Sequence, residues 1–181
     1  MRTHIWKVIR AVIFGWGVVS LLGAIGVGAL LFYQLGPGNR DKDDSASVRD
    51  VRFVLNWCGL GDQRIEKVLH SHVSGRSFTG DYLDAYAIKI SRVDISELAA
   101  PADDARWYRG DSLPKVVDDA VSFVSGSLHE LPWFPSPVEL RSSQFYVYPW
   151  SIYCHGTRAT AAELIFVRPA DNMVFYIGSK T

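Results

Sequence analysis

The chain has 181 residues, of which 19 are basic and 19 acidic, so its formal net charge is zero. This length suits one ordinary domain with extensions. A neutral chain lacks the basic surface that displaces counterions from phosphates, so we expect no nucleic-acid partner.

The chain begins with a basic tail and a long apolar run. Arg2, Lys7 and Arg10 lie in residues 1–10, and residues 11–33 contain no charged residue and no proline. At about 1.5 Å per residue, a helix of this length spans the roughly 30 Å hydrocarbon core of a bilayer. The sequence therefore predicts a cytoplasmic tail over 1–10 and a transmembrane helix over 11–35.

A cleavable secretory signal is the alternative for this run. Its apolar region would be about 7 to 15 residues long, so the longer run favours an uncleaved signal anchor. Basic residues are balanced across the span, but a long domain crosses the membrane largely regardless of its charge. We therefore expect a single-pass protein of the cell (inner) membrane, with a cytoplasmic N-terminus and a periplasmic or equivalent extracytoplasmic domain.

Small residues recur along the predicted membrane helix at Ser20, Ala24 and Gly28. Such a stripe lets a second membrane helix approach closely. Lateral association through this stripe is a hypothesis.

Residues 36–50 are rich in glycine, serine and charge, and they predict a flexible linker with solvated side chains. The extracytoplasmic domain is expected over 51–181. Val51–Trp57 is β-branched and aromatic, which predicts a strand. From Asp62 to Gly75 an amphipathic helix is predicted, since Ile65, Val68, Leu69 and His72 recur at helical spacing.

Two further elements are predicted in the middle of the domain. The alternation over Asp81–Ser91 indicates an interior strand that places Asp84 on one face with Tyr82, Tyr86, Ile88 and Ile90. A helix with Ser112 as its cap is expected to run to Leu131. Three prolines in Leu131–Leu140 predict an extended surface segment.

Three strand-like runs complete the chain at residues 143–150, 159–169 and 172–180. The last two form a predicted hairpin, and Pro149 indicates a sheet edge or a bulge. The predicted order β-α-β-α-β-β-β is typical of an α+β domain with a mostly antiparallel sheet and about two helices packed on one face.

Ligand types for zinc or copper occur at Cys58, His70, His72, Cys154 and His155. On a helix, residues two apart point about 200° away from each other, so His70 and His72 would not face one ion. Cys154 and His155 would point to opposite faces of a strand. We expect no metal site and no cofactor.

The two cysteines, Cys58 and Cys154, fall on the side that is expected to be exported, where disulfides form. The sequence therefore predicts a Cys58–Cys154 disulfide, with two free thiols as the alternative. A catalytic thiolate needs a base in an electropositive setting, which neither cysteine shows locally. Asp84 and His155 are the remaining weak catalytic candidates.

Aromatic residues are concentrated in the second half of the domain, several of them beside prolines and arginines. This composition is typical of partner-binding surfaces, although core packing is the alternative. We expect Trp133 and Phe134 to be an exposed pair. The candidate binding residues are Arg106, Trp107, Tyr108, Arg109, Trp133 and Phe134.

These patterns favour a membrane-anchored binding or accessory protein that acts on a protein partner, as an inhibitor, immunity or assembly factor does. The alternative is an anchored envelope hydrolase that uses Asp84 or a cysteine–histidine pair. A third hypothesis, a small-ligand sensor or carrier, requires a cavity.

Overall fold

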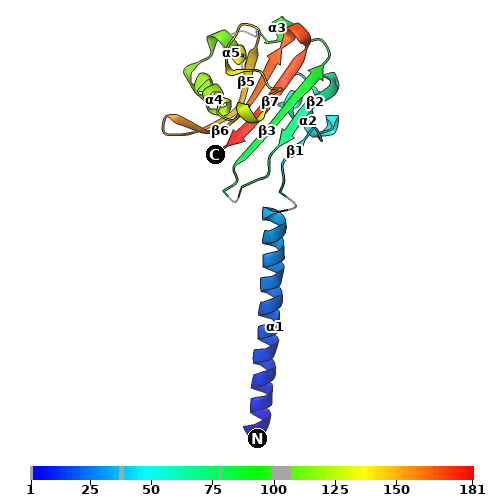
Figure 1. Ribbon diagram of the computed structural model, residues 1–181, viewed down its shortest axis with the longest axis vertical. Coiled ribbons are helices and arrows are strands. Elements are labelled where there is room, and N and C mark those ends of the chain that lie inside the picture. The colour runs from blue at the N-terminus through cyan, green and yellow to red at the C-terminus, as the bar shows by residue number, and fades with distance from the viewer. Residues whose placement is uncertain (1, 37–38, 78, 99–106) are drawn as a thin grey trace. The chain divides into compact units, whose positions relative to one another are not determined.

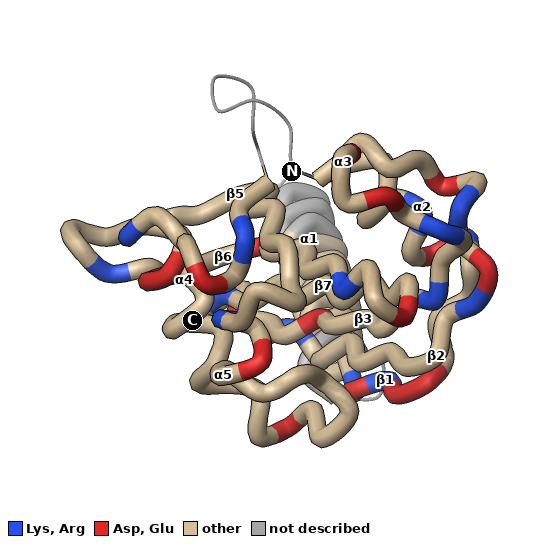
Figure 2. The backbone as a smooth tube through the Cα atoms, turned by 90° about the horizontal axis from the view of Figure 1, so that it is seen from above, with Lys and Arg blue, Asp and Glu red and all other residues tan. Residues whose placement is uncertain are grey.

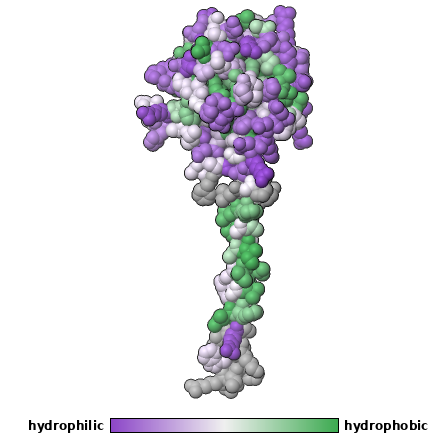
Figure 3. Space-filling view, in the orientation of Figure 1, coloured by the Kyte–Doolittle hydropathy of each residue, from purple (hydrophilic) through white to green (hydrophobic). Residues whose placement is uncertain are grey.

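The computed structural model describes residues 2–36, 39–77, 79–98 and 107–181, in two compact units, Met1–Arg40 and Asp41–Thr181. The first unit is one helix, α1 (Arg2–Leu35). Its side chains from Ile13 to Phe32 are all exposed, and most of this stretch of the helix surface is hydrophobic (Figure 3). This helix is long and apolar enough to cross a membrane, as a membrane anchor or a signal sequence does.

The second unit is built on a seven-stranded antiparallel sheet in the order β1-β2-β3-β7-β6-β5-β4 (Figure 1). The C-terminal strand β7 is its middle strand and pairs with both β3 and β6. The strands are β1 (Lys42–Asp43), β2 (Ile65–Val73), β3 (Tyr82–Ile90), β4 (Tyr108–Arg109), β5 (Tyr146–His155), β6 (Arg158–Arg168) and β7 (Met173–Lys180).

Helices cover both faces of the sheet, not one face as predicted. On one face α4 and α5 pack over a core that includes Ala85, Leu164 and Phe175; on the other, α2 packs over Ile88, Ile165 and Val174. Figure 2 shows α2 and α5 on opposite sides of the strands. The helices are α2 (Val48–Trp57), α3 (Ile95–Leu98), α4 (Lys115–Ser125) and α5 (Pro137–Leu140), with 3₁₀ turns η1 (Asp62–Arg64), η2 (Gly110–Ser112), η3 (Leu128–Glu130) and η4 (Pro169–Asp171).

The α+β class is confirmed, but the first two predicted elements of the domain are exchanged. The predicted strand over Val51–Trp57 is helix α2, which starts where the Ser47 N–H donates to Asp50 Oδ2 over 2.8 Å. Its buried residues, Val51, Val54 and Leu55, share one helical face. Their burial against the sheet outweighs the strand preference of β-branched residues.

The predicted helix after Asp62 is instead strand β2. Its pairing with β3 shifts register between Ile65 and Lys67 and again between Val68 and His70. Each shift inserts one extra residue, so the side chains that face α2 recur at intervals of three residues instead of two. Two bulges thus imitate the spacing of a helix.

The later elements agree better with the sequence. Strands β3, β6 and β7 form as predicted, and the β6–β7 hairpin turns through Asn172, whose φ is 52°. The predicted long helix ends at Ser125, and the proline-rich segment contains α5 instead of being wholly extended. A register shift between Pro149 and Ser151 confirms the predicted bulge.

Candidate functional site

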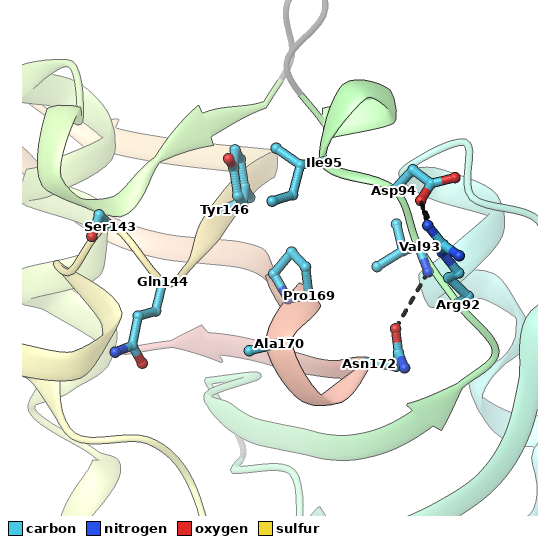
Figure 4. A pocket seen from close by; sticks show the side chains of 10 residues that line it. All are labelled: Arg92, Val93, Asp94, Ile95, Ser143, Gln144, Tyr146, Pro169, Ala170 and Asn172. Atoms are coloured by element: carbon cyan, nitrogen blue, oxygen red, sulfur yellow. Dashed lines mark hydrogen bonds and ion pairs between the residues drawn. The ribbon is translucent and has the colours of Figure 1, made fainter.

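An open pocket of about 540 Å³ lies at the end of the sheet where β3 ends and β5 begins (Figure 4). Three separate stretches line it: the loop after β3, the residues that lead into β5, and the β6–β7 turn. The lining residues are Arg92, Val93, Asp94, Ile95, Ser143, Gln144, Tyr146, Pro169, Ala170 and Asn172.

The pocket combines apolar walls with neutral polar groups and one charged pair. Ile95 and Tyr146 lie close together on one side, above Pro169 (Figure 4). The Val93 N–H donates to Asn172 Oδ1 over 3.4 Å, which ties the loop to the β6–β7 turn. Arg92 and Asp94 form an exposed ion pair at 3.0 Å. An uncharged small molecule with amide or hydroxyl groups fits such a lining.

Glu163 is the centre of a second polar cluster, on the face of the sheet that α2 covers. Its Oε1 accepts hydrogen bonds from the hydroxyls of Tyr82 at 3.3 Å and Tyr176 at 3.4 Å, and its Oε2 accepts one from Ser151 at 2.8 Å. Gly178 gives the tyrosines room, because a Cβ there would lie 2.6 Å from the Tyr176 hydroxyl oxygen. Glu163 was not predicted from the sequence, where its signal is a lone carboxylate within an apolar strand.

Asp84 belongs to the same face, as predicted, but it does not line the pocket. Arg76 Nη2 lies 2.6 Å from Asp84 Oδ2, while Oδ1 is buried and has no hydrogen-bond partner among the described residues. Burial raises the pKa of Asp84, although Arg76 opposes the shift. Burial also raises the pKa of Tyr82 to about 12, so its hydroxyl stays protonated at neutral pH. This network orders side chains and gives a substrate no access to the buried oxygen.

The predicted disulfide is absent: Cys58 and Cys154 are both free thiols. Cys58 ends α2 within the core on that face, where its thiol donates to Leu55 O over 3.4 Å. Burial raises its pKa to about 11, the opposite of what a nucleophile needs. Cys154 and His155 are exposed at the far end of β5, so no buried bridge joins the two regions.

The predicted exposed aromatic pair is also wrong. Phe134 is only 7 % exposed, with its ring centroid 5.5 Å from that of Phe175. Trp133 is half-buried and stacks on His70 at 5.3 Å. The hydrophobic effect buries this pair between α4 and the sheet, despite the flanking prolines.

The other candidate binding residues have mixed environments. Trp107 is half-buried against Tyr148, with 5.2 Å between ring centroids, and Tyr108 packs against the core below α4. Arg109 is exposed and pairs with Asp111 at 2.5 Å. Arg106 lies outside the described residues.

Exposed aromatic side chains occur instead on the hairpin formed by β5 and β6. We call residues 150–160 the β5–β6 arm. Tyr153 is 67 % exposed, and Trp150 is 40 % exposed while stacking on Trp57 with ring centroids 4.7 Å apart. Strand β4 pairs only with Tyr146 and Val147, so within the described residues the arm extends beyond its neighbour on the outer side of β5.

No family model matches this chain, and neither a curated protein nor a solved structure does.

The predicted separation of His70 and His72 by helix geometry is wrong, because both lie on strand β2, where residues two apart share a face. Each imidazole instead meets an aspartate: His72 Nδ1 lies 2.7 Å from Asp43 Oδ1, and His70 Nδ1 lies 3.5 Å from Asp44 Oδ1. In the part of the chain that the structure describes, no three His, Cys, Asp or Glu side chains are grouped to hold a metal ion.

Proposed function

We propose that this is a membrane-anchored binding or accessory protein, which presents the unit Asp41–Thr181 outside the cytoplasm to a protein partner. The observation that carries the proposal is the charge-free stretch Ile13–Phe32, whose side chains are all exposed in a helix of membrane-spanning length. An inhibitor, an immunity factor or an assembly factor would use such an anchor. The short basic tail favours a cytoplasmic N-terminus.

The β5–β6 arm is the partner-binding surface that we propose in place of the Trp133–Phe134 segment. Aromatic side chains contribute large contact areas at little entropic cost, and they are enriched at interface centres. Trp150 is already held by its stack on Trp57. Tyr153 lies on the same face of β5 and is free to be covered.

Cys154 provides a direct test of the proposed topology. Because Cys58 is buried, a maleimide that cannot cross membranes is expected to label only Cys154 in intact, reductant-treated spheroplasts. A Cys154→Ser variant serves as the control and is expected to stay unlabelled. Labelling of the wild-type chain only after lysis would place the domain in the cytoplasm and contradict the proposal.

Partner binding is tested by affinity purification of the full chain from crosslinked membranes. Tyr153→Ala is expected to lose a partner that the wild-type protein and Val138→Ala both retain. Val138, 82 % exposed on α5, controls for loss of an exposed apolar side chain elsewhere. Retention of every partner by Tyr153→Ala and by Trp150→Ala would exclude the arm.

The pocket favours a second candidate function, a small-ligand sensor or carrier. Its volume lies within the range of ligand sites, roughly 300 to 1,000 Å³. Native mass spectrometry of the detergent-purified chain is expected to show a bound small molecule that the pocket-filling variant Ile95→Trp lacks. The same spectrum for both proteins would contradict this function.

A further inference from the structure

The segment between α1 and the domain is docked on the edge of the sheet, beside β2. We call Asp41–Ser47 the strap. Asp43 pairs with His72 in the two-residue strand β1, and the next backbone N–H, of Asp44, donates to Ser71 O over 2.8 Å. Figure 2 shows β1 beside β2. From Asp41 onward, the predicted flexible linker is therefore an ordered part of the domain.

Aspartate side chains hold the strap at three points. Asp41 Oδ1 accepts from the Gly75 N–H at 2.7 Å, and Asp44 Oδ1 accepts from the Ser71 N–H at 3.1 Å. Asp43 Oδ1 meets the buried His72 ring at 2.7 Å. These charges, expected to be solvated, attach the strap together with the backbone pairing of β1 and the bond from the Ala46 N–H to Ser71 Oγ at 3.1 Å.

Apolar burial contributes little to this attachment. The Asp43 and Asp44 side chains are 74 % and 64 % exposed, and within the strap only Ala46 packs against a core. Asp44 also has a φ of 46°, in the left-handed region that is unfavourable for most residues. Segments with few buried apolar contacts open at lower free energy than the core.

Opening would change the length of the tether. Six residue steps separate Leu35, the end of α1, from Asp41, and at about 3.5 Å each they reach at most about 21 Å. With the strap released, twelve steps lead to Ser47, the N-cap of α2, and reach at most about 42 Å. The maximum reach doubles, and α2 stays in place.

We propose that the strap is a releasable clip, which holds the domain close to the membrane when docked and doubles its reach when it opens. Its effect at the membrane rests on the proposed anchor, whereas its opening is a property of the domain alone.

Hydrogen exchange of the full chain in lipid nanodiscs tests the opening. The amides of Asp44, Ser71 and Gly75 are expected to exchange through a separate opening, faster than those of β7. A triple variant, Asp41→Ala with Asp43→Ala and Asp44→Ala, is expected to speed exchange of the residue-44 amide by about tenfold or more, with β7 unchanged. This amide reports the opening because its acceptor, Ser71 O, is kept in the variant, whereas the amides of Ser71 and Gly75 lose a substituted acceptor. If the strap and β7 amides exchanged at the same rate, the strap would open only on global unfolding. This result would overturn the proposal.

Matched controls are Asp62→Ala, Asp111→Ala and Asp119→Ala, combined in one chain. These aspartates form surface ion pairs with Arg52, Arg109 and Lys115. Strap exchange at the wild-type rate is expected in this control. An equal acceleration in both triple variants would overturn the role of the strap aspartates.

Energy transfer from a dye on Cys154 to acceptor lipids measures how far the domain extends from the membrane. The strap variant is expected to show lower transfer than the wild type and the control. Equal transfer in all three would contradict the tether function. Absence of transfer in every protein would contradict the proposed anchor, while the exchange data would still decide whether the strap opens.

Discussion

Asp84 has two different environments on one carboxyl group. Oδ2 pairs with Arg76, whose guanidinium also lies 4.3 Å from the centroid of the Tyr82 ring, whereas Oδ1 is buried without a partner in the described part of the chain. The pKa is raised because burial outweighs the ion pair. A carboxylate in this setting is costly to the fold.

Asp84→Asn is expected to stabilise the protein at neutral pH. Since the folded pKa lies above the unfolded one, the carboxyl group contributes most to stability when protonated, and this contribution is lost as the pH rises through the folded pKa. The amide mimics the protonated form, so we expect a gain of about 1 kcal/mol in unfolding free energy at neutral pH. Denaturant titrations should show no gain near about pH 3.

An exposed aspartate gives the control for this experiment. Asp94→Asn, with a side chain 56 % exposed, is expected to leave stability unchanged at both pH values. A loss of stability in Asp84→Asn at neutral pH would show that the Arg76 ion pair outweighs the burial of Asp84.

The thiols of Cys58 and Cys154 are expected to differ in reactivity, because one is buried and the other is exposed. Alkylation of the folded protein near about pH 8 should modify Cys154 alone, because Cys58 is buried and its pKa is raised to about 11. Mass spectrometry before and after denaturation counts the modified thiols. Modification of Cys58 in the folded Cys154→Ser variant would contradict the packing described for α2.

At the scale of elements, the segment between α4 and α5 is part of the core. Phe134→Ala is expected to lower the free energy of unfolding by about 3–5 kcal/mol, because the ring packs against Phe166 and Phe175. Val138→Ala, at an exposed position on α5, should stay within about 0.5 kcal/mol of wild type. A small loss of unfolding free energy in Phe134→Ala, measured by thermal and denaturant unfolding, would support the earlier prediction that this segment is exposed.

The elements that could be predicted from the sequence are those whose residue pattern is regular. Strand β3 pairs with β7 without a register shift and α4 has an unbroken apolar stripe, so both were predicted. Strand β2 was missed because two bulges break its alternation, and α2 because its helical face consists of residues with strand preference. The local periodicity of a sequence predicts neither the bulges of β2 nor the burial of α2 against the sheet.

The candidate site was much less predictable than the fold. Asp84 and its face were correctly placed on β3, but Glu163 joins it from a strand nearly eighty residues later in the chain. The pocket combines Val93, Tyr146 and Asn172, which only the pairing of β3, β7, β6 and β5 brings to one end. The order of the strands in the sheet was therefore needed to predict the site, and the sequence patterns do not reveal this order.

For the whole molecule, the division into two units predicts that the domain folds by itself. Both cores lie within Asp41–Thr181, and the side chains from Ile13 to Phe32 are all exposed. A fragment of residues 41–181 is expected to be soluble and to unfold in one cooperative transition. Calorimetry should give the same transition temperature for this fragment and for the full chain in detergent, and a broad or shifted transition would contradict the division.

The position of β7 affects how the protein is made. Strand β7 follows every other strand of the sheet in the chain, yet it is the middle strand, bonded to β3 on one side and β6 on the other. Until Met173–Lys180 has left the ribosome, β3 and β6 have no neighbour between them, so neither core closes before β7 is made. A chain that must cross a membrane before folding would thus remain unfolded at least until β7 has been made.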